Sequence, residues 1–184
     1  MFKDVFKFIE NPNIHEPIVS TLQNYKMFAF GEDIDNALAP IDTNKIEDLV
    51  KIADFIVNSN VLGYGAKPKG MIKFHKYPGG NRTAFEEHLV EAAKYANSEN
   101  IAKIHFTVSA EHQSDIQHLI NQVVPNYERT YNVTYDVTYS VQKPSTDTIA
   151  ADENNEPFVE DGEILFRPGG HGALIHNLDD IEEQ

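Results

Sequence analysis

The sequence predicts an α/β fold with a mostly parallel sheet, within a chain of 184 residues. Helical and strand periodicities alternate in the second half of the chain, which is the pattern of strands joined by crossover helices. Residues 131–142 alternate Tyr or Val with polar side chains, and this period of two predicts a strand with one polar face. Hydrophobic residues make up 41% of the chain, enough for a core in a domain of this length.

Two amphipathic helices are predicted in the first third of the chain. The first begins at the second residue, and we expect residues 11–13 and Pro17 to end it. Residues 18–42 show little regular period. Asp42 or Asn44 is expected to cap the second helix. The apolar stripes are Phe2, Val5, Phe6 and Ile9 in the first helix, and Ile46, Leu49, Val50, Ala53, Ile56 and Val57 in the second.

The middle of the chain is predicted to form a loop, a short strand and a capped helix. Residues 61–70 have the composition of a loop, residues 71–75 that of a short strand and residues 78–81 that of a turn. Thr83 is followed three residues later by Glu86, the spacing of a capping box. The helix that it opens has its apolar face at Phe85, Leu89, Ala92 and Ala96.

Further elements complete the alternation. Residues 104–108 are expected to form a strand, after which Ser109 is expected to cap a helix. Residues 163–166 are expected to form one more strand. Gly170, His171 and Gly172 then lead into a short helix. The apolar positions are Ile104, Phe106 and Val108 in the strand, Ile116, Leu119, Ile120 and Val123 in the longer helix, and Leu174, Ile175 and Leu178 in the last one.

Composition excludes several classes of function. The chain has no cysteine, which rules out thiolate catalysis and zinc–sulfur sites and fits a reducing cytosol. A net charge of −14 disfavours nucleic acids and anionic membranes as partners. No apolar stretch reaches the roughly 18 residues of a membrane span. The acidic runs at residues 152–163 and 179–183 are interpreted as a solvated loop and tail.

Two segments are candidates for binding a phosphate or a nucleotide base. Lys69 lies in a Lys-Pro-Lys-Gly loop, where an ammonium could reach a phosphate or simply face solvent. The second segment, Gly169, Gly170, His171 and Gly172, lies at a strand-to-helix junction. Its backbone N–H groups could bind a ligand, or the glycines could serve a tight turn with positive φ. It matches neither the dinucleotide fingerprint nor the P-loop.

The histidines and serines point to no metal or nucleophile site. The eight histidines are scattered, without a ligand pair such as H-E-x-x-H. Ser109 and Ser145 lack the context of a nucleophile elbow. No metal-ligating residue is therefore predicted from the sequence.

Taken in order, these segments resemble the UDP-sugar pyrophosphorylases, most of all the UDP-N-acetylhexosamine enzymes. The resemblance covers about residues 67–178, and it is closer still to an uncharacterised bacterial family, the DUF4301 domain of unknown function. The residues that carry it are Pro68, Lys69, Gly70 and Met71, then residues 78–86, then Thr107, Val108 and Ser109, then Tyr139, Ser140, Val141 and Gln142, then Pro168, Gly169, Gly170, His171 and Gly172.

The resemblance implies a nucleotide-diphospho-sugar transferase fold of the Rossmann-like GT-A type, with three layers. It implies nucleotidyl transfer from UTP to a sugar 1-phosphate, giving a UDP-sugar and pyrophosphate, with Mg²⁺ as cofactor. Lys69 would contact phosphate, and Gln142 would hydrogen-bond the uracil edge. The backbone of Gly169, Gly170, His171 and Gly172 would face the base.

The chain also departs from the family pattern. No Gly-rich phosphate loop precedes Lys69, no strand with a metal-binding Asp follows, and His171 stands in place of an Asn. We therefore expect residues 1–66 to be a mainly helical insertion and residues 67–184 to be an incomplete nucleotidyltransferase-like core, truncated at both ends and inactive alone. Two alternatives stay open: a non-catalytic nucleotide-sugar-binding or regulatory module, and a gene fragment without function.

Overall fold

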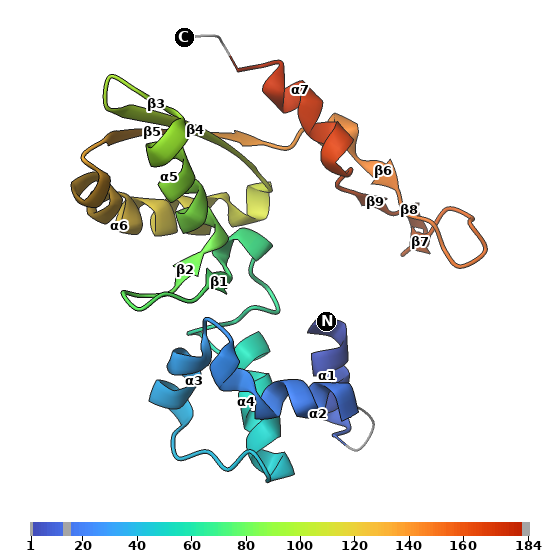
Figure 1. The fold of residues 1–184 in the computed structure, drawn as a ribbon. Coiled ribbons are helices and arrows are strands. Elements are labelled where there is room, and N and C mark those ends of the chain that lie inside the picture. The colour runs from blue at the N-terminus through green and yellow to red at the C-terminus, as the bar shows by residue number, and fades with distance from the viewer. Residues whose placement is uncertain (1, 13–15, 182–184) are drawn as a thin grey trace. The chain divides into compact units, whose positions relative to one another are not determined.

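The chain folds into two compact units, which are described separately below (Figure 1). The computed structural model describes residues 2–12 and 16–181. The first unit is Met1–Glu91 and the second is Ala92–Gln184. The expected domain division after residue 66 follows from the resemblance and stays a prediction.

Helices dominate the first unit. They are α1 (Phe2–Glu10), α2 (Glu16–Gln23), α3 (Gly31–Leu38) and α4 (Ile46–Asn58), with single 3-10 turns at Tyr25–Met27 and Lys69–Met71. A small hairpin of β1 (Lys73–His75) and β2 (Arg82–Thr83) follows, with Gly80 at φ 126° in its turn. The two helices and the turn that the sequence predicts here are confirmed.

The core of the first unit is apolar. Phe8, Ile34, Ile52 and Ala53 are fully buried, and Leu49 is 2% exposed. They come from α1, α3 and α4, so three helices contribute to one cluster. The fully buried aliphatic and aromatic groups stabilise the unit through the hydrophobic effect, at about 25 cal/mol per Å² of apolar surface removed from water.

The structure corrects four details of the predicted helices. Pro17 does not break a helix but occupies the first turn of α2, where a missing N–H costs little. Residues 18–42, which show little regular period, contain α3 and most of α2. Helix α1 buries Phe8, whereas Phe6 of the predicted apolar stripe is 37% exposed. Neither Asp42 nor Asn44 caps α4, whose N-cap is Lys45 without a side-chain hydrogen bond. Asn13, the last residue of the expected break, lies outside the described residues.

The capping box is confirmed at α5 (Ala84–Tyr95), the helix that runs from one unit into the other. Glu86 N–H donates to Thr83 Oγ1 at 3.2 Å, and Thr83 N–H donates to Glu86 Oε2 at 2.7 Å. These reciprocal bonds satisfy backbone donors that a helix start leaves unpaired.

The second unit is built around a parallel strand pair. Its elements are β3 (Asn97–Ser98), β4 (Ile101–Val108), α6 (Gln113–Tyr131) and β5 (Thr134–Val141), with a 3-10 turn at Ala110–His112. The sheet order is β3-β4-β5; β3 is antiparallel to β4, and β4 is parallel to β5. Helix α6 connects the two parallel strands, so the predicted βαβ pattern is confirmed.

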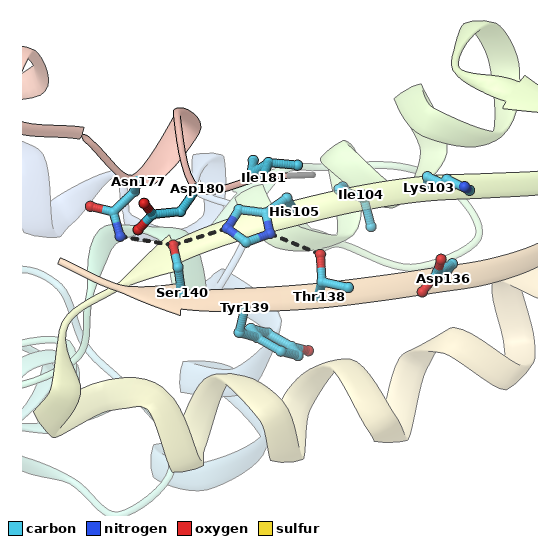
Figure 2. Close-up of a pocket in the computed structure, with 10 residues that line it drawn as sticks. All are labelled: Lys103, Ile104, His105, Asp136, Thr138, Tyr139, Ser140, Asn177, Asp180 and Ile181. Carbon is cyan, nitrogen blue, oxygen red and sulfur yellow. Dashed lines mark hydrogen bonds between the residues drawn. The ribbon is translucent and has the colours of Figure 1, made fainter. Parts of the chain in front are cut away.

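One face of the parallel pair is apolar and packs against α6. Ala102 is fully buried, while Phe106 and Tyr135 are each 8% exposed. On α6, Ile116 and Ile120 are buried, as the sequence predicts. The opposite face carries the polar alternate residues of both strands, which Figure 2 shows in part. The alternation along β5 therefore marks its two faces.

Two boundaries in this unit differ from the prediction. Tyr131 ends α6 rather than beginning the strand, because Asn132 adopts the left-handed conformation (φ 52°, ψ 48°) that commonly ends helices. Ser109 precedes the turn before α6 but makes no side-chain capping bond.

Four short strands between residues 148 and 167 connect β5 to the last helix. The elements of this segment are β6 (Thr148–Ile149), β7 (Val159–Glu160), β8 (Glu163–Ile164), β9 (Phe166–Arg167), a 3-10 turn (His171–Leu174) and α7 (Ile175–Leu178). Strand β6 pairs with β9 and β7 pairs with β8, so the single strand expected at residues 163–166 is two strands with different partners. The acidic run at residues 152–163 is exposed, as predicted, and the end of the second run lies outside the described ranges.

The chain is therefore a mixed α/β protein, as the sequence predicts at the level of fold class. Its largest sheet within the described residues has three strands. No helix in residues 2–12 and 16–181 is both long and apolar enough to cross a bilayer.

Candidate functional site

Gln142 lies at the carboxyl end of β5, one residue beyond the strand. Its N–H donates to the carbonyl of Val108 at 3.1 Å, which continues the parallel ladder past the end of β4. Its side-chain Nε2 donates to the carbonyl of Gly169 at 3.2 Å and lies 3.5 Å from Thr146 Oγ1. The amide is thus fixed by its nitrogen, while its Oε1 accepts no hydrogen bond from the part of the chain that the structure describes.

The glycine segment is held against this strand end by close backbone approach. A Cβ at Gly169 would lie 2.5 Å from the carbonyl oxygen of Thr146, so no larger residue fits without a shift. Gly170 and Gly172 have open space around them. None of the three has positive φ, so the alternative of a tight left-handed turn is wrong here. The structure therefore brings Gln142 and Gly169 together, with His171 exposed beside them.

Lys69 belongs to the first unit, in the 3-10 turn Lys69–Met71, and it is exposed. The adjacent Gly70 packs under the ring of Phe85, since a Cβ there would lie 2.4 Å from a ring carbon. The other predicted site residues belong to the second unit. Lys69 and Gln142 therefore belong to different units, and the phosphate contact of Lys69 stays a prediction.

A cavity of about 640 Å³ lies over the polar face of β4 and β5, beside α7 (Figure 2). His105 is at the centre of its hydrogen-bonded network. The ring Nδ1 lies 2.8 Å from Thr138 Oγ1, and Nε2 lies 2.9 Å from Ser140 Oγ. Ser140 Oγ is also 3.0 Å from Thr107 Oγ1. The register explains this arrangement, because His105 faces Thr138 and Thr107 faces Ser140 across the parallel pair.

Asn177 anchors α7 to this network and is only 2% exposed. Its Nδ2 donates to Ser140 Oγ at 3.0 Å and to the carbonyl of Val141 at 2.9 Å. The Val141 carbonyl fixes the orientation of the amide, since Oδ1 in that position would face another acceptor. Asn177 Oδ1 is buried and has no hydrogen-bond partner among residues 2–12 and 16–181. A buried acceptor without a donor costs about 1–3 kcal/mol of stability.

Charges around the cavity are close to balanced. Asp180 pairs with Lys143, Oδ2 to Nζ, at 2.5 Å. Asp136 faces Lys103 across the strand pair. Burial raises the pKa of Tyr139, so its phenol stays neutral at ordinary pH. The cavity offers mainly neutral hydrogen-bonding groups, which suits a polar ligand or a polar part of one.

Sequence reasoning missed His105, Ser140 and Asn177 as site residues. The alternation in residues 131–142 placed Ser140 on a polar face, but it did not reveal the neighbouring strand or the register. His105 lies between the apolar residues Ile104 and Phe106 in the sequence. This alternation was the signal that could have placed His105 on the polar face of the strand. Nothing in the pattern around Asn177 indicates that it is buried.

The described His, Asp and Glu side chains form no cluster of three that could hold a metal ion. Of the two carboxylates that line the cavity, Asp180 pairs with Lys143, and Asp136 lies opposite Lys103 on the neighbouring strand. The Mg²⁺ that the resemblance implies therefore stays a prediction, and no step is assigned to it.

Comparison with protein families identifies the chain over its whole length. The model of a domain of unknown function, DUF4301, matches residues 1–184. The chain belongs to the DUF4301 family. For this DUF4301 domain, comparison with curated proteins and with solved structures gives no significant match. The family description names no activity, so the function of the site has to be argued from its geometry.

Proposed function

We propose that the second unit of this DUF4301 domain binds a uridine nucleotide at the carboxyl end of its parallel strands. The parent reaction is nucleotidyl transfer from UTP to a sugar 1-phosphate. The observation that carries the proposal is the position of Gln142, at the carboxyl end of β5 and tied to Gly169. In open α/β sheets, ligands bind outside the carboxyl ends of the strands.

The side-chain amide of Gln142 has the chemistry to select uracil. The Watson–Crick edge of uracil presents one N–H donor between two carbonyl acceptors. Gln142 Oε1 accepts from that N–H, while the bond from Nε2 to the Gly169 carbonyl keeps the amide from rotating. A cytosine edge has an acceptor at the same position and would face Oε1 unfavourably.

The neighbouring polar cavity supports binding of the rest of the ligand. Ribose and sugar hydroxyl groups are both donors and acceptors, and the cavity offers the hydroxyl groups of Thr138 and Ser140. Its volume of about 640 Å³ lies within the range of small-molecule sites, about 300–1,000 Å³. The proposal includes a GT-A-like ancestry for the parallel pair and a phosphate contact for Lys69.

Thermal unfolding of the full chain with nucleotides tests the binding. A ligand at about 100 times its Kd stabilises by about 2.7 kcal/mol. We expect UTP or UDP-N-acetylglucosamine to raise Tm by at least about 4 °C, and CTP to raise it much less. Gln142→Ala should abolish the uridine-specific shift, whereas Gln122→Ala, an exposed glutamine on α6, should keep it. No shift with any uridine nucleotide, or an equal shift in Gln142→Ala, contradicts the proposal.

A second assay separates catalysis from binding. Pyrophosphate release from UTP and a sugar 1-phosphate, measured with Mg²⁺ present, would identify the chain as a transferase. In that case Lys69→Ala should lower turnover sharply. Binding without any turnover would favour the non-catalytic nucleotide-sugar module instead.

A further inference from the structure

Acidic and basic side chains are distributed unevenly along this chain. Residues 55–85 contain no Asp or Glu, although these two types account for 29 of the 184 residues. Residues 144–166 contain many carboxylates but no Lys or Arg. Each segment contains a β-hairpin, which is β1 with β2 in the first and β7 with β8 in the second (Figure 1). The two hairpins therefore lie in segments of opposite charge.

The acidic hairpin, residues 158–165, is formed by β7, β8 and the two-residue turn between them. Asp161 and Gly162 form this turn, with φ of 52° and 86°. Glu160 faces Glu163 directly across the two strands. Like charges in such a pair are destabilising, and neither carboxylate has an ion pair in the part of the chain that the structure describes. A cation from outside the chain would therefore stabilise the tip of this hairpin.

An exposed aromatic ring lies on the same face of the acidic hairpin as these carboxylates. The N–H of Leu165 donates to the carbonyl of Phe158 at 2.9 Å, which extends the strand pairing by one residue on each side. Phe158 is thus two residues from Glu160 along one strand, and side chains two residues apart project to the same face. Phe158 is exposed. A partner that fits this face is therefore both cationic and apolar.

The basic hairpin, residues 73–83, consists of β1, β2 and the turn between them, and it has this chemistry. Phe74 is 65% exposed. Lys76 is also exposed, and its Nζ donates to a backbone carbonyl at 2.9 Å. An ammonium has three donors, so Lys76 can bind a carboxylate as well. Lys73, by contrast, is already paired with Asp33, at 2.6 Å between Nζ and Oδ2.

We propose that the acidic hairpin of one chain binds the basic hairpin of a second copy. Lys76 lies against Glu160 and Glu163 in this contact, while Phe74 packs on Phe158. The spacings match, because each hairpin has its aromatic ring two residues before its charged group.

Charge complementarity identifies a second copy as the occupant, since each copy supplies the surface that the other lacks. The net charge of −14 opposes association over long range, so the attraction has to come from these two local surfaces. Every copy carries both hairpins, and the contact can therefore close as a symmetric dimer or continue as a chain of copies.

Analytical ultracentrifugation of the full chain over a range of concentrations tests the association. We expect Glu163→Lys and Lys76→Glu each to weaken it at least about tenfold, because each places like charges against one another. Glu163→Lys makes the chain less negative, so general repulsion between copies falls and cannot cause the loss. Glu111→Lys and Lys94→Glu make the same charge changes at exposed positions elsewhere and should retain the association.

A mixture of Glu163→Lys and Lys76→Glu chains separates a specific contact from a loss of folding. The mixture should associate where each variant alone does not, because the unchanged hairpins meet in one contact and the two reversed charges meet in the other. Circular dichroism should show both variants folded.

Three outcomes overturn the proposal: wild-type monomers at every concentration, association unchanged in both variants, and a mixture that associates no better than either variant alone. The hairpins share no residue with the cavity of Figure 2, so these outcomes are independent of nucleotide binding.

Discussion

The first unit encloses an apolar core, whereas the second unit covers only one face of its parallel strands with apolar groups. In the first unit, Ile52 and Phe8 are fully buried among aliphatic and aromatic side chains. In the second, α6 covers the apolar face, and the other face carries a hydrogen-bonded network around His105 and Ser140. The apolar core stabilises the first unit by burying hydrophobic side chains, while the second unit retains polar groups that could bind a ligand.

The two kinds of stabilisation should respond differently to mutation. An apolar core loses free energy in proportion to the volume removed. A polar network loses it when one partner is deleted and another is left unsatisfied. Three substitutions measure this difference, from the largest expected effect to the smallest.

Truncation of the first core should have the largest effect. Ile52→Ala creates a cavity at a fully buried position and should lower the free energy of unfolding by about 3 kcal/mol. Urea unfolding followed by circular dichroism measures this loss. Val61→Ala, at a position 59% exposed, should cost less than about 0.5 kcal/mol. Similar losses for both variants would mean that Ile52 is not in a close-packed core.

The polar network should lose less. Asn177→Ala leaves the Val141 carbonyl without its donor, removes one hydrogen bond to Ser140 and should cost about 2 kcal/mol. It also removes the unpaired Oδ1, which offsets part of that loss. Asn126→Ala, an exposed control on α6, should change stability by less than about 0.5 kcal/mol. A stabilised Asn177→Ala variant would show that the unpaired oxygen outweighs the two bonds.

The third substitution, Tyr25→Phe, should have the smallest effect on stability, and this effect should depend on pH. A hydrogen bond from the Tyr25 hydroxyl, together with Lys26, holds the pKa of Asp35 below its ordinary value, although burial opposes the shift. Burial, followed by the Asp35 contact, raises the pKa of Tyr25 to about 12, so the phenol remains a donor. Tyr25→Phe should therefore cost about 1.5 kcal/mol at pH 7.

The sign of the pH dependence follows from the lowered pKa of Asp35. The stability from this group is full above the pKa of an unfolded Asp, about 3.9, and is lost as the pH falls through the lower folded value. The difference between wild type and Tyr25→Phe should shrink on acidification below about pH 4. Urea unfolding at pH 7 and pH 3 measures it, with Tyr95→Phe as an exposed control. A difference that is independent of pH would contradict the assigned pairing.

Local patterns predicted those features that depend on neighbours in the sequence. The Thr83 and Glu86 spacing gave the capping box, because both bonds lie within one turn. Residues 18–42 escaped prediction because α2 and α3 are only about two turns each, too short for a clear period. The start of β5 was misplaced because Tyr131 fits both the strand alternation and the end of α6.

The candidate site was predictable only in part, for the same reason. Gln142 could be placed at the end of a polar strand face, since alternation fixes which residues share a face. Its bond to Gly169 joins residues 27 positions apart, and no local pattern records that pairing. Lys69 and Gln142 are in the first and fourth of the five segments that carry the resemblance, and they belong to different units.

The sequence by itself determined the α/β class, the capping box at α5 and the polar face of β5, because these follow from local periodicity and short-range bonds. Only the tertiary structure decided that His105 lies between Thr138 and Ser140, since strand register sets those neighbours. It alone decided that Asn177 is buried, with its Oδ1 unpaired among the described residues. Burial and register depend on which distant segments pack together, and this information is spread over the whole chain rather than held in any one motif.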